Sequence, residues 1–337
     1  MRIGNIDIDK PVILAPMEDV TDISFRLVCK ELGADIMYTE FVNSEGLIRA
    51  SRKTMRKMMF LEEERPFGIQ LYGGAEQSME TAAGMAGELR PDLIDINCGC
   101  WVKKIAGRGE GAGLLRDLPK MERIIRTVIG AVRVPVTVKT RLGWDASSIR
   151  ITEVARMVEQ TGAAALTIHC RTRAQGHKGE PEYRWIEPVK SAVGIPIIVN
   201  GGIDSAEKAR TVFAETGCDG VMIAQAAITN PWIFGEVHHL LRTGRLKPEP
   251  DFAERVRVMR RHLTLSVEYK GEQRAVLEFR KHYSGYLRNY HNIGQLRSRL
   301  MQFTELAPIL EIIDNLEEPA PVSPAADRMQ TAGVPIA

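Results

Sequence analysis

The residues best suited to chemistry in this chain follow a short apolar run. Leu93-Ile94-Asp95-Ile96 leads into Asn97-Cys98-Gly99-Cys100 and then into Trp101-Val102-Lys103-Lys104. An unperturbed thiol ionises at about pH 8.5, so a neutral Cys100 beside cationic groups can act as an acid as well as a nucleophile. Most isolated cysteines are instead small buried apolar residues. Whether Cys100 is a reactive thiol or a buried apolar residue depends on the elements that position it.

Eight short apolar runs recur in the first two thirds of the chain: 12–15, 35–39, 67–71, 93–97, 135–139, 165–169, 196–200 and 220–223. Their continuous hydrophobicity is typical of strands buried on both faces, and the helix-like segments between them indicate parallel strands joined by crossovers. Eight such units predict an α/β protein with a (β/α)₈ TIM barrel. A doubly wound sheet is the alternative, but its usual Gly-rich first turn is replaced here by Ala15-Pro16-Met17-Glu18.

The strand pattern stops after Pro231-Trp232, and the rest of the chain is predicted to be helical. We expect a barrel over 1–240, a linker over 241–250, a small all-helical domain over 251–317, and a disordered Pro- and Ala-rich tail over 318–337. From Arg242 to Arg299, fourteen Lys or Arg stand against six Asp or Glu, although the whole chain has a net charge of only +2. This excess predicts an anionic partner such as nucleic acid, with a solvated basic surface as the alternative.

Composition excludes several classes of protein. The five cysteines are widely spread, without metal-type pairing or a disulfide framework, which fits a reducing cytoplasm. The N-terminal residues lack the apolar core of a signal peptide, and no stretch approaches the roughly 18 apolar residues of a membrane span. No convincing metal site and no Walker-type loop is present. We therefore expect a soluble cytoplasmic protein without a metal, as a monomer.

The ends of the predicted strands suggest a flavin site. A reduced isoalloxazine ring needs a cation, which Lys139 would supply, and amide partners at its edge, which Gln70 would supply. Pro16 and Met17 offer an apolar shelf. The loop Asn200-Gly201-Gly202-Ile203 offers backbone N–H groups where barrels bind phosphate. An ordinary wet barrel rim with a tight turn remains the alternative.

Several ordered motifs together resemble one family, the bacterial tRNA-dihydrouridine synthases, in the branch with Lys-Lys after the catalytic cysteine segment. The resemblance covers residues 1–320 and rests on Leu14-Ala15-Pro16-Met17, Gln70-Leu71-Tyr72-Gly73, Ile96-Asn97-Cys98-Gly99-Cys100, Val138-Lys139-Thr140-Arg141-Leu142-Gly143-Trp144, Ile168-His169-Cys170-Arg171-Thr172-Arg173, Val199-Asn200-Gly201-Gly202-Ile203, Thr229-Asn230-Pro231-Trp232 and Arg280-Lys281-His282.

The resemblance implies an FMN enzyme that reduces the 5,6 double bond of selected uridines in tRNA, with NADPH or NADH as reductant. Hydride would pass from flavin N5 to uracil C6, and Cys100 would donate the proton to C5. The implied cofactor-binding residues are Pro16, Met17, Glu18, Gln70, Lys139, His169, Asn200, Gly201, Gly202, Ala224 and Gln225. The implied tRNA-binding residues are Asn97, Arg141, Arg171, Arg280, Lys281 and His282. Tyr283, Tyr286 and Tyr290 would either stack on RNA bases or form a helix core stripe.

Three positions depart from the family pattern. Trp101 stands where a proline usually follows the cysteine, and Gly202 replaces an acid. Ala224-Gln225 replaces a Gly-Arg pair that meets the FMN phosphate, a loss of about 1.5 to 3 kcal/mol unless another cation substitutes. Two alternative functions therefore remain open: a tRNA-binding protein with weakened or lost flavin chemistry, and a flavin barrel that reduces a small enone or pyrimidine.

Overall fold

The computed structural model describes residues 1–288, 290 and 292–316. The predicted tail, 318–337, lies outside the described residues. The chain divides into two compact units, Met1–Pro248 and a second unit that begins at Glu249. This boundary falls within the predicted linker, but helix α11 (Ile233–Thr243) extends into that stretch, so residues 241–243 are helical rather than linker.

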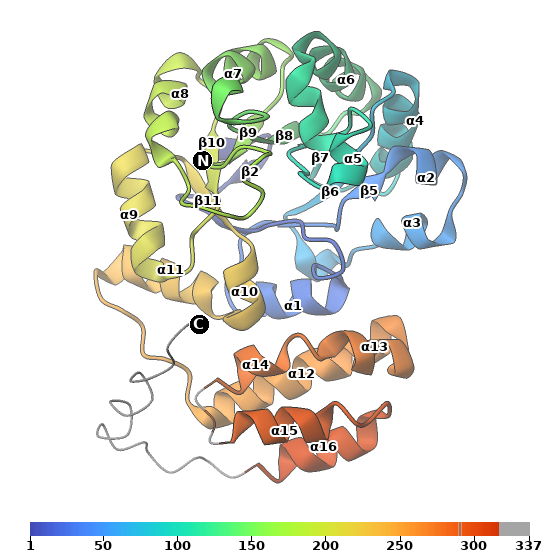
Figure 1. Cartoon of the computed structure of the whole chain (residues 1–337), viewed down its shortest axis with the longest axis vertical. Helices are drawn as coiled ribbons and strands as arrows, with labels where there is room; N and C mark the ends of the chain where they lie inside the picture. The colour runs from blue at the N-terminus through green and yellow to red at the C-terminus, as the bar shows by residue number, and fades with distance from the viewer. Residues whose placement is uncertain (289, 291, 317–337) are drawn as a thin grey trace, which may run out of the picture. The chain divides into compact units, whose positions relative to one another are not determined.

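The first unit is built on a ring of eight parallel strands (Figure 1). They are β3 (Val12–Leu14), β4 (Met37–Tyr38), β6 (Phe67–Tyr72), β7 (Leu93–Cys98), β8 (Val136–Arg141), β9 (Ala165–His169), β10 (Ile197–Asn200) and β11 (Gly220–Ile223). The first and last strands pair, since β11 lies beside β3. The ring is nearly closed beside β4, where the Leu14 amide donates to the Ile36 carbonyl at 3.1 Å. The predicted TIM barrel is confirmed.

Helices follow the strands and cover the outside of the barrel (Figure 1). The main ones, besides α11, are α1 (Ile23–Glu31), α4 (Glu76–Gly87), α6 (Leu118–Ala131), α7 (Ile151–Gln160), α8 (Ile186–Ala192) and α9 (Ala206–Thr216). Helix α7 shows why they pack: Ile151, Val154, Ala155 and Val158 share one face and are buried. Asp22 begins α1 by accepting from the Phe25 amide, and left-handed Gly217 ends α9.

Short elements fill the loops that follow the strands. They are β5 (Val42–Asn43), α2 (Ser44–Ile48), α3 (Arg52–Lys57), η1 (Glu62–Glu64), α5 (Lys103–Ala106), η2 (Gly111–Arg116), η3 (Ala146–Ser148), η4 (Tyr183–Trp185) and α10 (Gln225–Thr229). The strands β1 (Arg2–Ile3) and β2 (Ile6–Asp7) form a separate antiparallel pair. Because loops at the carboxyl ends of barrel strands build the site in this fold, these insertions decide its walls.

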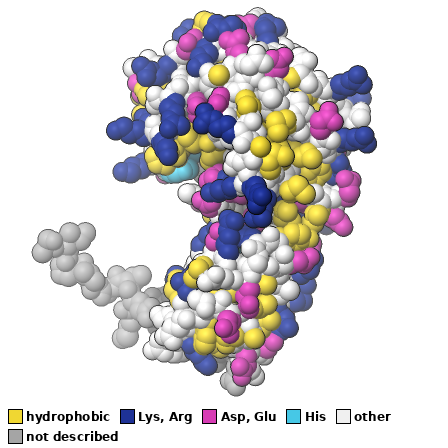
Figure 2. Space-filling view, turned by 90° about the vertical axis from the view of Figure 1, so that its right-hand side faces the viewer, with side chains coloured by type: hydrophobic (Ala, Val, Ile, Leu, Met, Phe, Trp, Pro, Cys, Tyr) yellow, Lys and Arg dark blue, Asp and Glu magenta, His cyan; other side chains and the backbone are white. Residues whose placement is uncertain are grey.

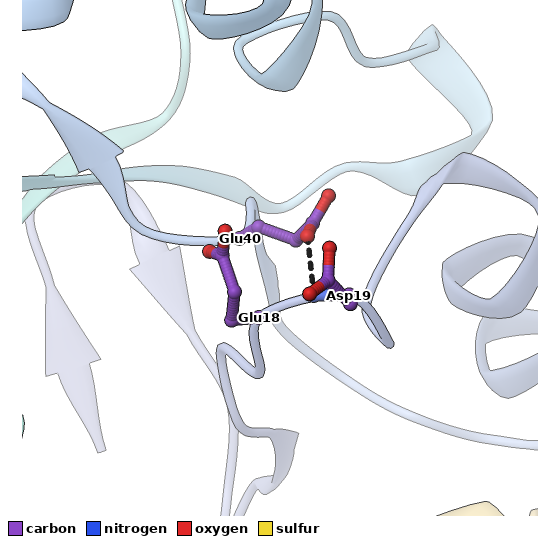
Figure 3. Close-up of side chains that lie close together, drawn as sticks. All are labelled: Glu18, Asp19 and Glu40. Atoms are coloured by element: carbon purple, nitrogen blue, oxygen red, sulfur yellow. Dashed lines mark hydrogen bonds between the residues drawn. The ribbon is translucent and has the colours of Figure 1, made fainter. Parts of the chain in front are cut away.

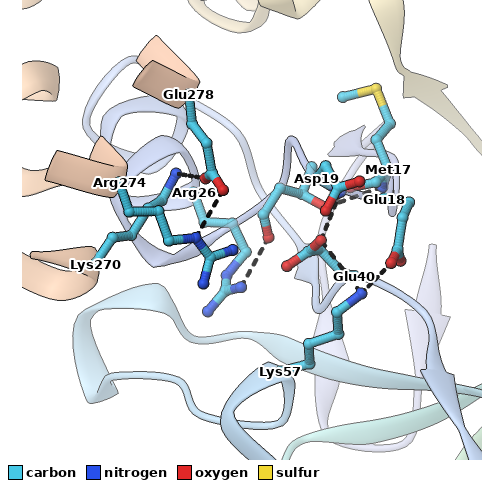
Figure 4. A network of polar contacts seen from close by, with 10 residues as sticks. Met17, Glu18, Asp19, Arg26, Glu40, Lys57, Lys270, Arg274 and Glu278 are labelled. Carbon is cyan, nitrogen blue, oxygen red and sulfur yellow. Dashed lines mark hydrogen bonds and ion pairs between the residues drawn. The ribbon is translucent and has the colours of Figure 1, made fainter. Parts of the chain in front are cut away.

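The second unit consists of helices α12 (Phe252–Lys270), α13 (Glu272–Phe279), α14 (Tyr283–Tyr286), α15 (Ile293–Leu300) and α16 (Leu306–Asp314). Within it, Lys270 and Arg274 both donate to Glu278, at 3.0 and 2.7 Å (Figure 4). Tyr283 and Tyr286 are 0% and 1% exposed, so they form the core stripe rather than a stacking surface. In the described part of the chain, no helix is long and apolar enough to cross a membrane.

Candidate active site

Two adjoining cavities open among the carboxyl ends of the barrel strands. The first, of about 300 Å³, contains the side chains around Cys100. The second, of about 400 Å³, contains the loop after β10 and shares His169, His177 and Asn200 with the first. Every barrel residue that the sequence predicted for the site lines one cavity or both: Pro16, Met17, Glu18, Gln70, Asn97, Cys100, Lys139, Arg141, His169, Arg171, Asn200, Gly201, Gly202, Ala224 and Gln225.

A buried row of hydrogen bonds fixes two side chains of the first cavity. The Asp95 carboxylate accepts from Thr137 Oγ1 at 2.5 Å and from Gln70 Nε2 at 2.6 Å. Gln70 Oε1 in turn accepts from Asn97 Nδ2 at 2.9 Å. Because an ionised carboxylate only accepts, it fixes the Gln70 amide in one orientation, and Gln70 fixes Asn97. Burial raises the pKa of Asp95 to about 6, which leaves it ionised at neutral pH.

Asn97 shapes the loop that carries the thiol. Its Oδ1 accepts from the backbone N–H groups of Gly99 and Cys100, at 3.0 and 2.8 Å. Burial raises the pKa of the Cys100 thiol above its ordinary value, although the Val102 amide and Arg141 act in the opposite direction. Cys100 is therefore a neutral thiol at physiological pH. This protonation state suits a proton donor better than a nucleophile.

Lys139 brings a buried cation to the same cavity. Its Nζ donates to Asn200 Oδ1 at 2.8 Å, and Asn200 Nδ2 donates to the Met222 carbonyl at 2.8 Å. Burial, followed by repulsion from Arg141, lowers the pKa of Lys139 to about 8. The ammonium is thus mostly protonated at neutral pH and makes a hydrogen bond without a full counter-charge, which favours an anionic or electron-rich ligand.

Arg141 ties two loops of the site together. Its Nε donates to the Gly99 carbonyl at 2.8 Å, next to Cys100. Its Nη1 donates to the carbonyls of Thr172 and Gly176, at 3.0 and 2.8 Å, in the loop after β9. The cysteine loop and the β9 loop are consequently held against one guanidinium at the edge of the cavity.

The second cavity has a backbone cradle and a cation. Gly201 has a φ of +105°, and a Cβ there would lie 2.5 Å from His169 Cδ2. Gly202 has a φ of +69°, and a Cβ there would lie 2.4 Å from Pro181 Cγ. Only glycine fits both positions without strain. Arg171 lines this cavity and its Nη1 lies 3.3 Å from His169 Nε2.

Trp101 forms a wall of the first cavity beside Cys100. Its Nε1 donates to His177 Nε2 at 3.1 Å, and the two rings are nearly perpendicular, at 87°. Burial, followed by repulsion from Arg141, lowers the pKa of His177, which keeps the imidazole neutral and able to accept. The indole is 39% exposed, so it lies at the cavity edge instead of filling the interior.

Three carboxylates, Glu18, Asp19 and Glu40, meet beside the loop after β3 (Figure 3). Lys57 donates to Glu18 and lies 3.6 Å from Glu40 Oε1 (Figure 4). The Asp19 amide also donates to Glu40, at 2.6 Å. The ammonium supplies the positive charge that these acids need, so we assign no metal ion to them. The cluster holds Glu18 at the rim of the first cavity.

Comparison with known proteins gives the family. The model of the dihydrouridine synthase (Dus) family matches residues 13–320. The tRNA-dihydrouridine synthase B of Pseudomonas syringae pv. tomato is 40% identical over 298 residues, which cover 88% of each chain. The probable tRNA-dihydrouridine synthase 1 of Synechocystis sp. is 38% identical over 316 residues, which cover 93% of this chain and 88% of that one. This chain belongs to the dihydrouridine synthase family. The family predicted from its motifs is confirmed.

Among solved structures, a 6-hydroxypseudooxynicotine amine oxidase from Pseudomonas geniculata N1 is similar in fold. It matches with a TM-score of 0.54 and 13% identity, over 77% of this chain and 52% of that one. At that identity the likeness concerns the barrel alone, and the dihydrouridine synthase family is the basis for function.

The structure explains one departure from the usual dihydrouridine synthase pattern. An acid at position 202 would have to displace Pro181 and adopt a left-handed backbone, so glycine here matches the local packing. The second departure, Trp101, is accommodated by His177. For the third, Ala224-Gln225, both residues line the second cavity, which also contains Arg171, a cation that the sequence assigned to tRNA binding.

In the second unit, Arg280, Lys281 and His282 lie in the break between α13 and α14. Arg280 Nη2 donates to the Met301 carbonyl at 2.6 Å. His282 is 2% exposed and packs against His262, with ring centroids 4.6 Å apart. Its place in RNA binding would therefore be to hold the turn rather than to contact RNA.

Sequence reasoning missed two residues of the site. Asp95 lines neither of the two cavities described above, yet it orients Gln70 and Asn97. An acid inside a continuous apolar strand was its available signal in the sequence. His177 lines both cavities, but it stands in a loop eight residues after the end of β9. Nothing in the local pattern indicates that this loop folds back over the cavity.

Proposed function

We propose that this chain is an FMN-dependent tRNA-dihydrouridine synthase, which reduces the C5–C6 double bond of uridine in tRNA with NADPH or NADH as reductant. The observation that carries the proposal is the convergence of a neutral thiol, four side-chain amides and two cations on one barrel cavity in a member of this family. Such groups recognise a planar, carbonyl-bearing base and deliver a proton to it. We place the enzyme in the cytoplasm, as a monomer.

The two cavities fit FMN. Lys139 would lie against the electron-rich edge of the ring, while Gln70, with its amide orientation fixed by Asp95, would pair with the ring edge. Gly201 leaves room for a phosphate near Arg171, because a side chain at 201 would collide with His169. When bound, FMN supplies the hydride for the reduction.

The protein's own residues handle the proton and the developing charge. Cys100 donates its thiol proton to C5 of uracil, and the resulting thiolate is stabilised by Arg141 and the Val102 amide. Asn97 and Arg141 would hold the uracil carbonyls as negative charge develops on them. Trp101, held by His177, shields the reacting base from water at the side of the cavity.

Access to uracil C5 and C6 in folded tRNA requires the base to leave its stack, at a cost of roughly a few kcal/mol. Contacts to the RNA backbone must offset that cost. The basic second unit, with Arg280 and Lys281, is our candidate for part of these contacts, since 242–299 carries a net charge of +8.

Two measurements on the purified protein test this proposal. The first is the flavin absorption spectrum with and without added FMN. The second is the dihydrouridine content of tRNA from a host without its own synthases, after incubation with FMN and NADPH. We expect bound flavin and new dihydrouridine, both retained in the matched control Cys218→Ala, whose thiol is 5% exposed before β11.

Cys100→Ala should retain flavin and lose most of the reduction of tRNA. An unchanged rate in this variant would refute the proton-donor role. Tight binding of tRNA without any flavin at saturating FMN would favour the alternative of an RNA-binding protein without flavin chemistry. Reduction of free pyrimidines or enones at rates above those for tRNA would favour a small-molecule reductase.

A further inference from the structure

Two arginines near the active site lie against the same indole. The guanidinium carbon of Arg116 lies 5.0 Å from the ring centroid of Trp144, and that of Arg173 lies 4.4 Å from it. Within residues 1–288, 290 and 292–316, neither arginine has a carboxylate oxygen within 4.0 Å. Arg173 Nε is also buried without a hydrogen-bond partner in that described part of the chain.

Two exposed arginines of the barrel, by contrast, pair with acids. Arg123 pairs with Glu76 at 2.7 Å, and Arg150, which follows Trp144 in the same loop, pairs with Glu153. The acid next to Trp144, Asp145, accepts from the amide and hydroxyl of Ser147 at 3.0 and 2.7 Å. The loop therefore keeps its own acid away from the two guanidiniums on Trp144.

Backbone hydrogen bonds connect the segments that carry Arg116, Arg173 and Trp144 to the loops of the active site. Arg116 ends η2, and the Ala112 amide near the start of η2 donates to the Cys100 carbonyl at 3.1 Å. The Arg173 amide donates to the Gly143 carbonyl at 2.9 Å, which joins the loop after β9 to the loop after β8. Both arginines are thus placed by elements that also form the active site.

Positive charge accumulates here. Burial lowers the pKa of Arg141, and the charges of Arg171 and Arg173 lower it further. Like charges held this close repel one another, and an incoming anion relieves the repulsion. Figure 2 shows Lys and Arg side chains interspersed with apolar side chains on one face of the larger unit. Such a mixture suits the backbone and bases of a nucleic acid.

We propose that Arg116 and Arg173, held against Trp144, form a subsite for a phosphodiester of the RNA strand beside the reacting uridine. This inference rests on the proposed function. Stacking on an indole fixes a guanidinium and leaves its N–H fork free for a phosphate. The phosphates of the reductant share this chemistry. RNA is the better occupant because none of the three residues lines either cavity, so the ligand must extend beyond them, as a polymer does.

The test compares Arg116→Gln, Arg173→Gln and the double variant with wild type and with Arg133→Gln. Arg133 is an exposed arginine before β8, at the opposite end of that strand from the site. For each FMN-loaded protein we would measure the Kd for unmodified tRNA, and the KM values for tRNA and NADPH, at several salt concentrations. We expect each single variant to raise the Kd and KM for tRNA by about three- to tenfold. The double variant should reduce the salt slope of log Kd by about 0.7 to 0.9 for each phosphate that the protein no longer neutralises.

Substitution of Trp144 provides an independent test, because it changes the surface under the two arginines without removing a charge. Trp144→Leu removes the surface on which both guanidiniums rest and should weaken tRNA binding about as much as the double variant, whereas Trp144→Phe should retain most of the affinity. The thermal midpoint of each variant, measured in parallel, separates loss of the surface from loss of the fold.

Three outcomes would overturn the inference. In the first, the arginine variants match Arg133→Gln in tRNA affinity and salt slope while wild type reduces tRNA normally, so the subsite fails and the proposed function stands. In the second, the KM for NADPH rises while tRNA binding is unchanged, which assigns the arginines to the reductant. In the third, wild type neither binds nor reduces tRNA, which removes the proposed function together with the subsite.

Discussion

Replacing Asp95 with asparagine tests the buried hydrogen bonds beneath the candidate site. Burial raises the pKa of Asp95 from 3.8 to about 6. As pH rises, the unfolded chain therefore loses this proton before the folded protein does. Between the two pKa values the folded protein holds more protons than the unfolded chain, so the free energy of unfolding falls as pH rises. A gap of about two pKa units corresponds to about 3 kcal/mol, of which about 2 kcal/mol is lost between pH 4.5 and pH 7.5.

The assay is urea unfolding of wild type and Asp95→Asn at both pH values. The new amide can still accept from Gln70, and the Thr137 hydroxyl can turn to accept from it, so the variant should fold. Because the variant cannot ionise, its stability relative to wild type should improve by about 2 kcal/mol between pH 4.5 and pH 7.5.

Asp145→Asn is the matched control. Hydrogen bonds from Ser147 and Ser148 lower the pKa of Asp145, so this carboxyl titrates below the range tested and its variant should show no comparable gain. If the difference between wild type and Asp95→Asn is the same at both pH values, Asp95 is not the costly buried charge that the structure indicates.

Three further predictions concern the cavity walls. The pH midpoint for alkylation of Cys100 by iodoacetamide should lie above that of the thiol in a short cysteine peptide, because burial raises the thiol pKa; a midpoint below that of the peptide would contradict a neutral proton donor. In wild type, the KM for tRNA should rise by about fivefold well below pH 6.5, as His177 gains a proton and can no longer accept from Trp101. The variant His177→Gln keeps a hydrogen-bond acceptor that does not titrate, so its KM for tRNA should not change with pH in this range. If the variant shows the same pH dependence as wild type, this role for His177 is rejected. Gly202→Asp should reduce the free energy of unfolding by roughly 1 to 3 kcal/mol, measured in urea, because of its φ of +69° and the contact with Pro181; undiminished stability would show that the loop relaxes freely.

The sequence by itself determined the barrel and most of the candidate site. Eight continuous apolar runs that alternate with helical segments favour interior parallel strands, and residues at the carboxyl ends of such strands in a barrel meet at one rim. Gln70, Asn97, Lys139 and His169 could therefore be assigned to one site from their positions in the chain, since each stands at or near a strand end.

Only the tertiary structure showed which loop residues reach the site and which aromatic side chains are buried. The loop that places His177 against Trp101 has no periodic pattern, so its path depends on contacts such as those between Arg141 and Gly176. The alternatives for Tyr283 and Tyr286 were equal in sequence, because a helical stripe of aromatic residues suits a core as well as a binding face. Their burial assigned them to the core.

Burial also decided the protonation states, which depend on surroundings that are distant in sequence. Residue type alone gives Cys100 and Lys139 their ordinary pKa values, and the closed barrel raises the first and lowers the second by removing water from both. The sequence named the groups that act, and the packing of the barrel around them decided which of them hold a proton.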